Sequence, residues 1–451
     1  MPFQTRAAQP ELSRELGVSH AAAIVIGTII GSGIFLVPAE MIQAAGSPML
    51  VYLAWIIGGL LSFFGALTYA ELGAMKPQAG GGYIYIRDAY GPLAGFLYAW
   101  NWFIIAKPAS IATITTGLVR ILGTFPAFAF FSQNAFLNIT FGQLVAIAAT
   151  ILISLLNYLG IRRAGEFQLV FTLLKIAIIL AITGIGFSYA EGSWRHFSQH
   201  AGMGRGIAGF MAALVAALWA YDGWNDLNMV GGEIRHPERN IPVALIAGVA
   251  SVGALYMLLN AAVQYVLPPA AIAASPGPAS DAAQVVIGSL GATIVSVGMA
   301  ISMLVTLNGT IMSGARIPYA VARDRYFFSA LAEVSPKYHT PAVALLVQAM
   351  LALALLMLGG SFRQLFSLAI FAEWLFYMIA ASTVFVFRHR DPNLERPYRV
   401  WGYPLVPALF VAASGVLLYY TFTENLRNSG LGLLVILAGV PAFYAFARRR
   451  A

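Results

Sequence analysis

Two stretches of the sequence place glycines and polar residues inside long apolar runs. Residues 27–38 read GTIIGSGIFLVP, and residues 219–226 read WAYDGWND. Glycine tolerates unusual dihedral angles and lets a ligand approach the backbone closely, so each stretch favours the interruption of a helix. An interruption exposes N–H and C=O groups that are otherwise paired within the helix. We therefore expect both stretches to bind a ligand through their backbone.

The exposed groups of the two stretches would have opposite polarity. The amides of residues 32–34 would begin a new helix, and free N–H groups at a helix start suit an anion such as a carboxylate. Helices ending near residues 28–30 and 219–220 would offer carbonyls that suit an ammonium group. An amino acid carries both charges, so it is the predicted ligand. The predicted substrate-binding residues are Thr28, Ile30, Gly31, Ser32, Gly33, Ile34, Trp219, Ala220, Asp222 and Asn225.

Three ionisable residues stand out within apolar runs, where each costs about 2.5–3.5 kcal/mol at the centre of a membrane helix. Lys175 lies in FTLLKIAIIL, Asp222 in the second glycine stretch and Glu373 in FAEWLF. Lys175 is either a fixed cation that braces the first interruption or a lysine paired with a carboxylate such as Glu373. Asp222 either faces the binding cavity and favours a cationic side chain, or only accepts hydrogen bonds from its own interrupted backbone.

Aromatic and amide side chains near these positions are further candidates. Trp219 precedes the second interruption and is either a lid over the ligand or a packing residue. Asn225, Trp374 and Asn308 are candidate cavity-lining residues, whereas Lys107 could reach the membrane surface or kink its helix and is given no role. The predicted coupling and gating residues are Lys175, Trp219, Glu373 and Trp374.

Several kinds of chemistry are disfavoured by what the sequence lacks. It has no cysteine, which excludes disulfides and thiolate metal sites, and no GxxxxGK[ST] phosphate-binding motif. Its six histidines fall at the predicted ends of apolar runs or between them, which argues against haem, zinc or a histidine proton relay. We therefore predict no metal, no cofactor and no catalytic residue, and the chain is not expected to be an enzyme.

The elements that position these residues are membrane helices. Of 451 residues 59% are hydrophobic and 10% charged, and the mean hydropathy is +0.78. Soluble domains have about 25% charged residues, so the composition predicts an all-α polytopic membrane protein. Twelve spans are predicted, at residues 18–44, 49–75, 93–121, 140–160, 165–189, 207–232, 242–267, 282–315, 341–359, 364–387, 402–422 and 430–447.

The net charge of +8 follows from topology. With twelve spans, 19 of the 26 Lys and Arg residues fall on the side of both termini and five on the other. The positive-inside rule then places both termini in the cytoplasm of a cell whose inner membrane holds the protein. Because the charge is explained in this way, nucleic acid is not expected as a partner; the lipid bilayer is.

The two glycine stretches begin two blocks of five spans each. The blocks cover residues 18–190 and 207–388, are nearly equal in length, and follow a tail at 1–17. Because five is odd, the second block enters the membrane from the opposite face, which predicts an inverted repeat with two accessory helices at 402–448 and one transmembrane domain over 1–451. Gly27 and Gly31 alone would also fit a GxxxG packing face. The matching second interruption favours paired broken helices.

Several motifs make the chain similar to a known family. These are GTIIGSGIF near the start, ELGAMKPQAGGGYIYI (71–86), WAYDGWNDLNMVGGEIRHPERNIPVAL (219–245), LNGTIMSGARIPYAVARD (307–324) and RHRDPNLERPYRV (388–400). In this order they resemble the L-type amino acid transporters of the amino acid-polyamine-organocation superfamily. The resemblance covers nearly the whole chain.

The resemblance implies a LeuT-like five-plus-five inverted repeat and sodium-independent exchange of L-amino acids by alternating access. Residues 31–34 match the family's carboxylate-binding segment, and Trp219 matches its aromatic gate. Asn225 matches the polar residue that stabilises the sixth-span break, and Lys175 the lysine that replaces sodium.

Two features of the sequence bear on the partner subunit and on the substrate class. Animal members join a heavy subunit through a cysteine, and this chain has none, so it resembles the free-standing prokaryotic members. Trp219 and Asp222 resemble a branch whose animal members also accept dibasic amino acids, whereas similar bacterial members exchange small neutral ones. We expect small neutral substrates, with dibasic ones open. A proton-coupled symporter and an amino-acid-binding membrane sensor are the alternatives, and the oligomeric state is not predicted.

Overall fold

The computed structural model describes residues 11–136, 139–202, 204–357, 362–424 and 426–448. Within these residues the chain is mostly helical, and its strands are limited to a two-stranded hairpin, β1 and β2. The elements of the first part are α1 (Val18–Ile29), α2 (Gly33–Ala45), α3 (Pro48–Met75), α4 (Gly82–Tyr90), α5 (Pro92–Asn101), η1 (Trp102–Ala106), α6 (Lys107–Leu122), η2 (Pro126–Ser132), β1 (Asn134–Phe136), β2 (Ile139–Thr140), α7 (Phe141–Tyr158), α8 (Ile161–Phe187) and η3 (Trp194–Ser198).

The second part of the chain adds helices only, within the described residues. They are α9 (Gly206–Ala220), α10 (Asp226–Met229), η4 (Gly231–Glu233), α11 (Pro237–Val266), α12 (Pro269–Ala274), α13 (Pro278–Ile287), α14 (Ser289–Gly314), α15 (Arg316–Arg323), η5 (Ser329–Ala332), α16 (Ala342–Met357), α17 (Phe362–Arg390), α18 (Leu405–Glu424) and α19 (Leu426–Arg448).

The described helices make this a polytopic membrane protein, as its composition predicts. Ten stretches are long and apolar enough to cross a membrane, and some combine consecutive elements, such as Val18–Ala45 and Ser289–Arg323. The sixth and ninth predicted spans correspond to the shorter apolar helices α9 and α16, of 15 and 16 residues. The count of twelve spans therefore stays a prediction.

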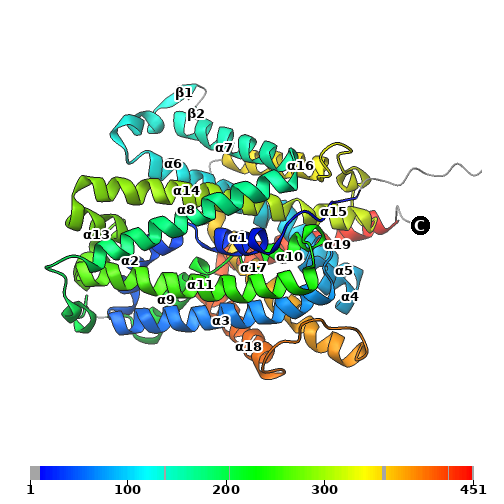
Figure 1. Ribbon diagram of the computed structural model, residues 1–451. Helices are drawn as coiled ribbons and strands as arrows, with labels where there is room; N and C mark the ends of the chain where they lie inside the picture. The colour runs from blue at the N-terminus through cyan, green and yellow to red at the C-terminus, as the bar shows by residue number, and fades with distance from the viewer. Residues whose placement is uncertain (1–10, 137–138, 203, 358–361, 425, 449–451) are drawn as a thin grey trace, which may run out of the picture.

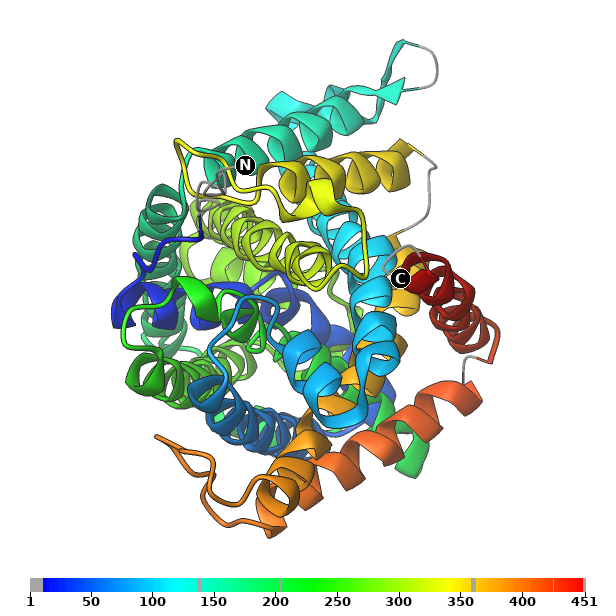
Figure 2. The same ribbon diagram turned by 90° about the vertical axis from the view of Figure 1, so that its right-hand side faces the viewer.

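The long helices run side by side, and several short elements lie at the two ends of the bundle. In Figure 1, α4, α5 and α15 lie at the right-hand end, whereas the β1–β2 hairpin and α13 lie at the left. Figure 2 looks along the bundle and shows α18 and α19, in orange and red, on its outside. α18 packs on α3 and α17, and α19 packs on α5 and α17.

The first predicted span is two helices rather than one. α1 ends at Ile29 and α2 begins at Gly33, with Ile30 in an extended conformation (φ −73°, ψ 90°). The predicted interruption is confirmed. The predicted eighth span, 282–315, is wrong at its start, because Gly288 with φ 69° turns the chain between α13 and α14.

The third predicted span contains a π-helical segment that the sequence pattern does not indicate. η1 (Trp102–Ala106) connects α5 to α6 and ends directly before Lys107 and Pro108. A π-helical turn holds an additional residue and is frequent at functional sites in helices. The segment therefore sets the face of α6 on which Lys107 lies.

Buried ion pairs tie together the end of the bundle where both described chain ends lie. Arg316 makes two hydrogen bonds to Glu233, at 2.7 and 2.8 Å, and both side chains are 0% exposed. Arg388 makes a second bidentate pair with Glu71, at 2.9 and 2.6 Å. Near the chain start, the side chain of Glu11 pairs with Arg323 at 3.4 Å. The two buried pairs join η4 to α15 and α3 to α17, and the exposed Glu11–Arg323 pair joins the chain start to α15.

We predict that Arg316→Met destabilises the protein. The substitution leaves Glu233 buried without its cation, and breaking a buried pair in this way costs about 3–5 kcal/mol. The control is Arg162→Met, because Arg162 and Glu166 form an exposed pair (69% and 54% exposed) that contributes about 0–1 kcal/mol. Thermal unfolding in detergent should show a large decrease in Tm for the first variant and little for the second. Equal shifts would contradict the assignment.

Candidate functional site

The two helix interruptions meet in the middle of the bundle. α9 ends at Ala220, turn residues follow from 221 to 225, and α10 begins at Asp226. Gly223 has a φ of 109°, and a Cβ at that position would lie 3.0 Å from the backbone of Thr28. Glycine is therefore required both for the dihedral angle and for the close approach of the two breaks.

One buried hydroxyl joins the two helix ends. The hydroxyl of Tyr256, on α11, lies 3.1 Å from the carbonyl oxygen of Ile29 and 2.8 Å from that of Ala220. The ring packs edge-on against Trp55 and lies 5.1 Å from Tyr221 between centroids. Carbonyls at the C-terminal end of a helix have no partner within the helix, so Tyr256 satisfies one at each break.

Lys175 satisfies the carbonyls of the first break from another side. Its ammonium group lies 2.8 Å from the Gly27 carbonyl oxygen and 2.7 Å from that of Ile30. On α14, the hydroxyls of Ser302 and Thr306 also donate to the Ile30 carbonyl, at 2.7 and 3.2 Å. Among the described residues Lys175 makes no ion pair, so the alternative of a pair with a carboxylate is wrong.

The amides that begin α2 have no such partners. The N–H groups of Ser32, Gly33 and Ile34 donate to no acceptor within the described residues. Gly33 packs so closely on α9 that a Cβ there would lie 3.2 Å from Ala220 and 3.3 Å from Trp219. The first break therefore has satisfied carbonyls on one side and free N–H groups on the other.

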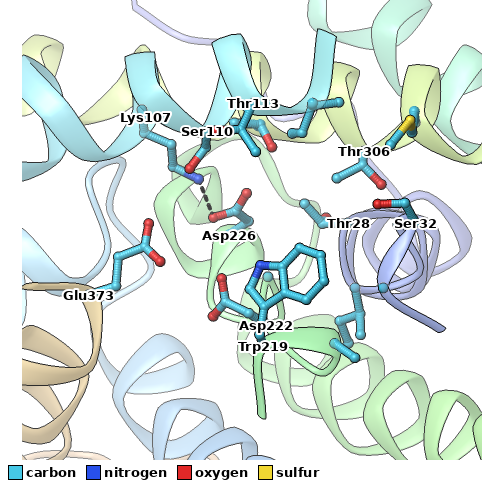
Figure 3. Close-up of a pocket in the computed structure, with 18 of the residues that line it drawn as sticks. Thr28, Ser32, Lys107, Ser110, Thr113, Trp219, Asp222, Asp226, Thr306 and Glu373 are labelled. Atoms are coloured by element: carbon cyan, nitrogen blue, oxygen red, sulfur yellow. Dashed lines mark hydrogen bonds and ion pairs between the residues drawn. The ribbon is translucent and has the colours of Figure 1, made fainter. Parts of the chain in front are cut away.

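The breaks line a cavity with a volume of about 120 Å³ (Figure 3). Its walls come from the two breaks, α6, η1, α14 and α17. The cavity is lined by Thr28, Ile29, Gly31, Ser32, Gly33, Trp102, Lys107, Ser110, Thr113, Ile114, Trp219, Ala220, Asp222, Gly223, Asp226, Met303, Thr306, Thr310, Glu373 and Tyr377.

The predicted residues divide into those that line the cavity and those that lie behind it. The lining includes Thr28, Gly31, Ser32, Gly33, Trp219, Ala220, Asp222 and Glu373. Ile30, Ile34 and Lys175 are outside the lining, although the Ile30 carbonyl receives the Lys175 ammonium. The helix periodicity of an apolar run does not show which face meets a cavity when every face is buried.

Three further predicted liners pack elsewhere. Asn225 accepts a hydrogen bond from the Tyr377 hydroxyl at 3.2 Å, and Trp374 packs on the rings of Tyr377 and Phe410. Asn308 donates to Gln168 at 2.7 Å, behind the first break. None of these three is among the lining residues.

Asp222 fits both of its alternatives. Its carboxylate lines the cavity and accepts a hydrogen bond of 2.9 Å from the Tyr377 hydroxyl. It also accepts from the backbone of Gly223 within its own interruption. The side chain therefore supports the break while facing the cavity.

Lys107, which has no predicted role, pairs with a carboxylate at the cavity. Its ammonium group lies 2.6 Å from Asp226, and both side chains are at most 5% exposed. The Ser313 hydroxyl donates to the other carboxylate oxygen of Asp226 at 2.8 Å. Lys107 and Ser110 are three residues apart, so the sequence indicates that they share one face of α6, but it gives no signal for the partner 119 residues away.

A polytopic helical protein with a polar cavity between two broken helices has the construction of a membrane transporter. The amino acid permease family matches residues 16–441, and the chain belongs to this family. It is 33% identical to the serine/threonine exchanger SteT of Bacillus subtilis, covering 98% of both chains. It is 32% identical to the mouse b(0,+)-type amino acid transporter 1 (96% of this chain, 88% of the relative) and 29% to the human cystine/glutamate transporter (97% and 86%).

These similarities confirm the resemblance to L-type amino acid transporters. They also bear out the expectation of an amino acid transport protein in a membrane, since the family match and the ten long apolar helices agree. The roles of individual residues remain predictions, which the geometry of the cavity makes specific.

We predict that Tyr256→Phe destabilises the junction of the two breaks. Without the hydroxyl, the buried Ala220 carbonyl loses its donor, which costs about 1–3 kcal/mol. The matched control is Tyr420→Phe, which removes a hydroxyl bonded to the Ala208 carbonyl at an exposed position. Thermal unfolding in detergent should give a clearly lower Tm for the first variant alone. Identical small shifts would show that the hydroxyl does not hold the breaks together.

Proposed function

We propose that the protein is a sodium-independent exchanger of L-amino acids that works by alternating access. Small neutral amino acids are its principal substrates, and dibasic ones are further substrates. The observation that carries this proposal is the set of free amides at Ser32, Gly33 and Ile34, at the start of a helix where Ser32 and Gly33 line the cavity. Free N–H groups and the positive end of the helix dipole suit the α-carboxylate of an amino acid.

The ends of α1 and α9 supply the complementary charge. Their carbonyls at Ile29 and Ala220 each accept from Tyr256, and the Ile29 carbonyl also accepts from the Gly31 amide at 2.8 Å. A carbonyl oxygen has two lone pairs, so among the described residues the Ala220 carbonyl keeps one for a ligand. The α-ammonium group of the substrate takes this acceptor, aided by the negative dipole ends of both helices. Trp219 lines the cavity beside these carbonyls and acts as the gate over the substrate.

Lys175 makes sodium unnecessary in this proposal. The carbonyls of Gly27 and Ile30 and the hydroxyls of Ser302 and Thr306 form an oxygen-rich site. Such oxygens are the ligands that hard metal cations prefer. Because the ammonium group of Lys175 is already bonded there, the first break has a fixed positive charge and needs no ion from solution.

The proposed architecture follows the two interruptions. Residues 18–190 form the first repeat of five spans, 207–388 the inverted second repeat, and 402–448 the two accessory helices, which makes twelve spans in one domain. The support is that the first span of each repeat is broken and that the two breaks meet at the cavity. The distribution of Lys and Arg supports a cytoplasmic position for the tail at 1–17 and for the C-terminus, in the inner membrane of a bacterial cell.

Alternating access requires a change in the ion-pair contacts at the end of the helix bundle where both described chain ends lie. In the structure, the Glu71–Arg388 pair connects a helix of the first proposed repeat to one of the second, whereas Glu233–Arg316 lies within the second repeat. The Glu71–Arg388 pair must loosen when the cavity opens to the cytoplasm. The sequence has no cysteine, so a disulfide-linked heavy subunit is not part of the proposal.

Proton-coupled symport is the second candidate, and one observation favours it. The carboxyl of Glu373 lines the cavity and makes no hydrogen bond or ion pair among the described residues. A carboxyl group in such a place is a suitable proton carrier. Exchange and symport differ in whether flux requires a substrate on the far side of the membrane.

We predict that purified protein in liposomes loaded with alanine takes up labelled alanine far faster than it does in empty liposomes. An exchanger returns its cavity to the outer side only with a substrate bound, which is the reason for the difference. Replacing sodium with choline should leave the initial rate unchanged. Equal uptake into empty vesicles would contradict exchange, and concentrative uptake driven by an imposed pH gradient would select the symporter.

We also predict that Gly33→Val weakens substrate binding. The added side chain presses on Ala220 and Trp219, and such overpacking costs about 1–3 kcal/mol, or about tenfold in affinity for each 1.4 kcal/mol. Gly184→Val is the control, because a Cβ at this exposed position of α8 meets nothing within 4 Å. Alanine binding can be measured by calorimetry in detergent. Wild-type affinity in the Gly33 variant would remove the carboxylate assignment.

A further inference from the structure

The cavity wall formed by α6, the turn at 221–225, α10 and α17 is strongly acidic. Figure 3 shows Lys107, Asp222, Asp226 and Glu373 around one space, so three carboxyl groups face a single ammonium group. Lys107 bonds to Asp226, which also receives the Ser313 hydroxyl. The Lys107 ammonium and the Asp226 carboxylate therefore satisfy each other. The carboxyl groups of Asp222 and Glu373 have no ion-pair partner among the described residues.

Asp222 and Glu373 differ in their support. Asp222 receives two hydrogen bonds, from the Tyr377 hydroxyl and from the backbone of Gly223. Glu373 receives none among the described residues, although it is only 7% exposed. In Figure 3 its carboxyl group points into the space between Lys107 and Asp222. Glu373 is thus a buried acid aimed into the cavity without a partner of its own.

The groups that face Glu373 from the surrounding elements do not supply a dedicated cation. Asp222 and Asp226 act on it by repulsion, and Lys107 is the cation within electrostatic reach but bonds to Asp226. Tyr98 on α5 and Tyr377 on α17 are the neighbouring phenols. Burying an ionised carboxylate without a partner is very unfavourable, so Glu373 requires a positive group when it is charged.

We propose that Glu373 binds the cationic side chain of a dibasic amino acid and holds a proton whenever the cavity carries a neutral one. The inference rests on the proposed exchange function and adds a substrate-dependent proton to it. When the dibasic substrate enters, the O–H bond of the Glu373 carboxylic acid breaks and the proton leaves to water on the side to which the cavity is open. The ammonium or guanidinium group of the substrate takes its place.

This replacement balances the charge of the cavity. With a neutral amino acid bound, Glu373 is protonated and uncharged. With a dibasic amino acid bound, Glu373 has lost its proton, and its negative charge is balanced by the extra positive charge of the substrate. The net charge of the occupied site is the same in both states. Exchange of one dibasic amino acid for one neutral amino acid therefore moves one proton with the neutral substrate. No net charge crosses the membrane in the complete cycle.

The test is arginine uptake by wild-type protein in alanine-loaded liposomes. A pH-sensitive dye inside the vesicles should show alkalinisation as arginine enters, with one proton leaving per arginine. Alanine-for-alanine exchange should give no such signal. An interior-negative potential set with valinomycin and potassium should leave the initial rate of arginine uptake unchanged. Acceleration by that potential without proton movement would overturn the proposal.

The variant Glu373→Gln tests the residue. Removing one partner of a buried charge contact predicts that the KM for arginine rises about thirtyfold relative to the KM for alanine, which corresponds to about 2 kcal/mol. The proton signal should also disappear. Glu395→Gln makes the same chemical change at an exposed position and should behave like wild type. If the ratio of the KM for arginine to the KM for alanine is unchanged in the Glu373 variant, another group binds the cationic side chain of arginine.

The outcomes separate this inference from the proposed function. If the vesicles exchange alanine but take up no arginine, exchange stands and the Glu373 inference fails. If they exchange neither amino acid, the proposed function fails and the inference with it. Should the Gln variant not fold, the dye and potential measurements on wild-type protein still decide between a proton replacement and net charge transfer.

Discussion

Unpaired backbone carbonyls inside a membrane protein are the constraint on which the rest of this structure depends. Each interrupted helix leaves such carbonyls far from water, where an unsatisfied polar group costs several kcal/mol. The protein meets this with donors from neighbouring helices: Lys175 and Ser302 for Ile30, and Tyr256 for Ile29 and Ala220. With those carbonyls satisfied, the amides on the other side of the first break are left free for a ligand.

The two breaks contribute different chemical groups to the cavity. The first break contributes backbone groups and small side chains, such as Gly31, Gly33 and Ser32, so the substrate can approach the chain itself. The wall that includes the second break contributes charge, including Asp222 and Asp226. Recognition of the constant part of an amino acid and of its variable side chain is thereby separated in space. One scaffold can then serve related transporters whose side-chain specificities differ.

The sequence predicts the broken helices well and the partners of the cavity poorly. Glycines and charges inside apolar runs are local signals, so the interruptions near Gly31 and Gly223 could be predicted. The burial of Lys175 follows from its place in an apolar run. The Lys107–Asp226 pair joins residues 119 positions apart, and a tyrosine such as Tyr256 looks like ordinary packing until the helix ends beside it are known. Side-chain partners in a bundle depend on helix rotation, which a single sequence does not fix.

The π-helical segment η1 has a consequence for how this cavity can change in evolution. It holds one more residue than an α-helical turn, and one residue corresponds to a rotation of about 100° in an α-helix. Deleting a single residue between Trp102 and Ala106 would restore regular winding and swing Lys107 away from Asp226. This segment therefore tolerates replacement of its side chains far better than a change in its length. Loss of one codon there would leave a helix of the same hydrophobicity with its lysine directed elsewhere.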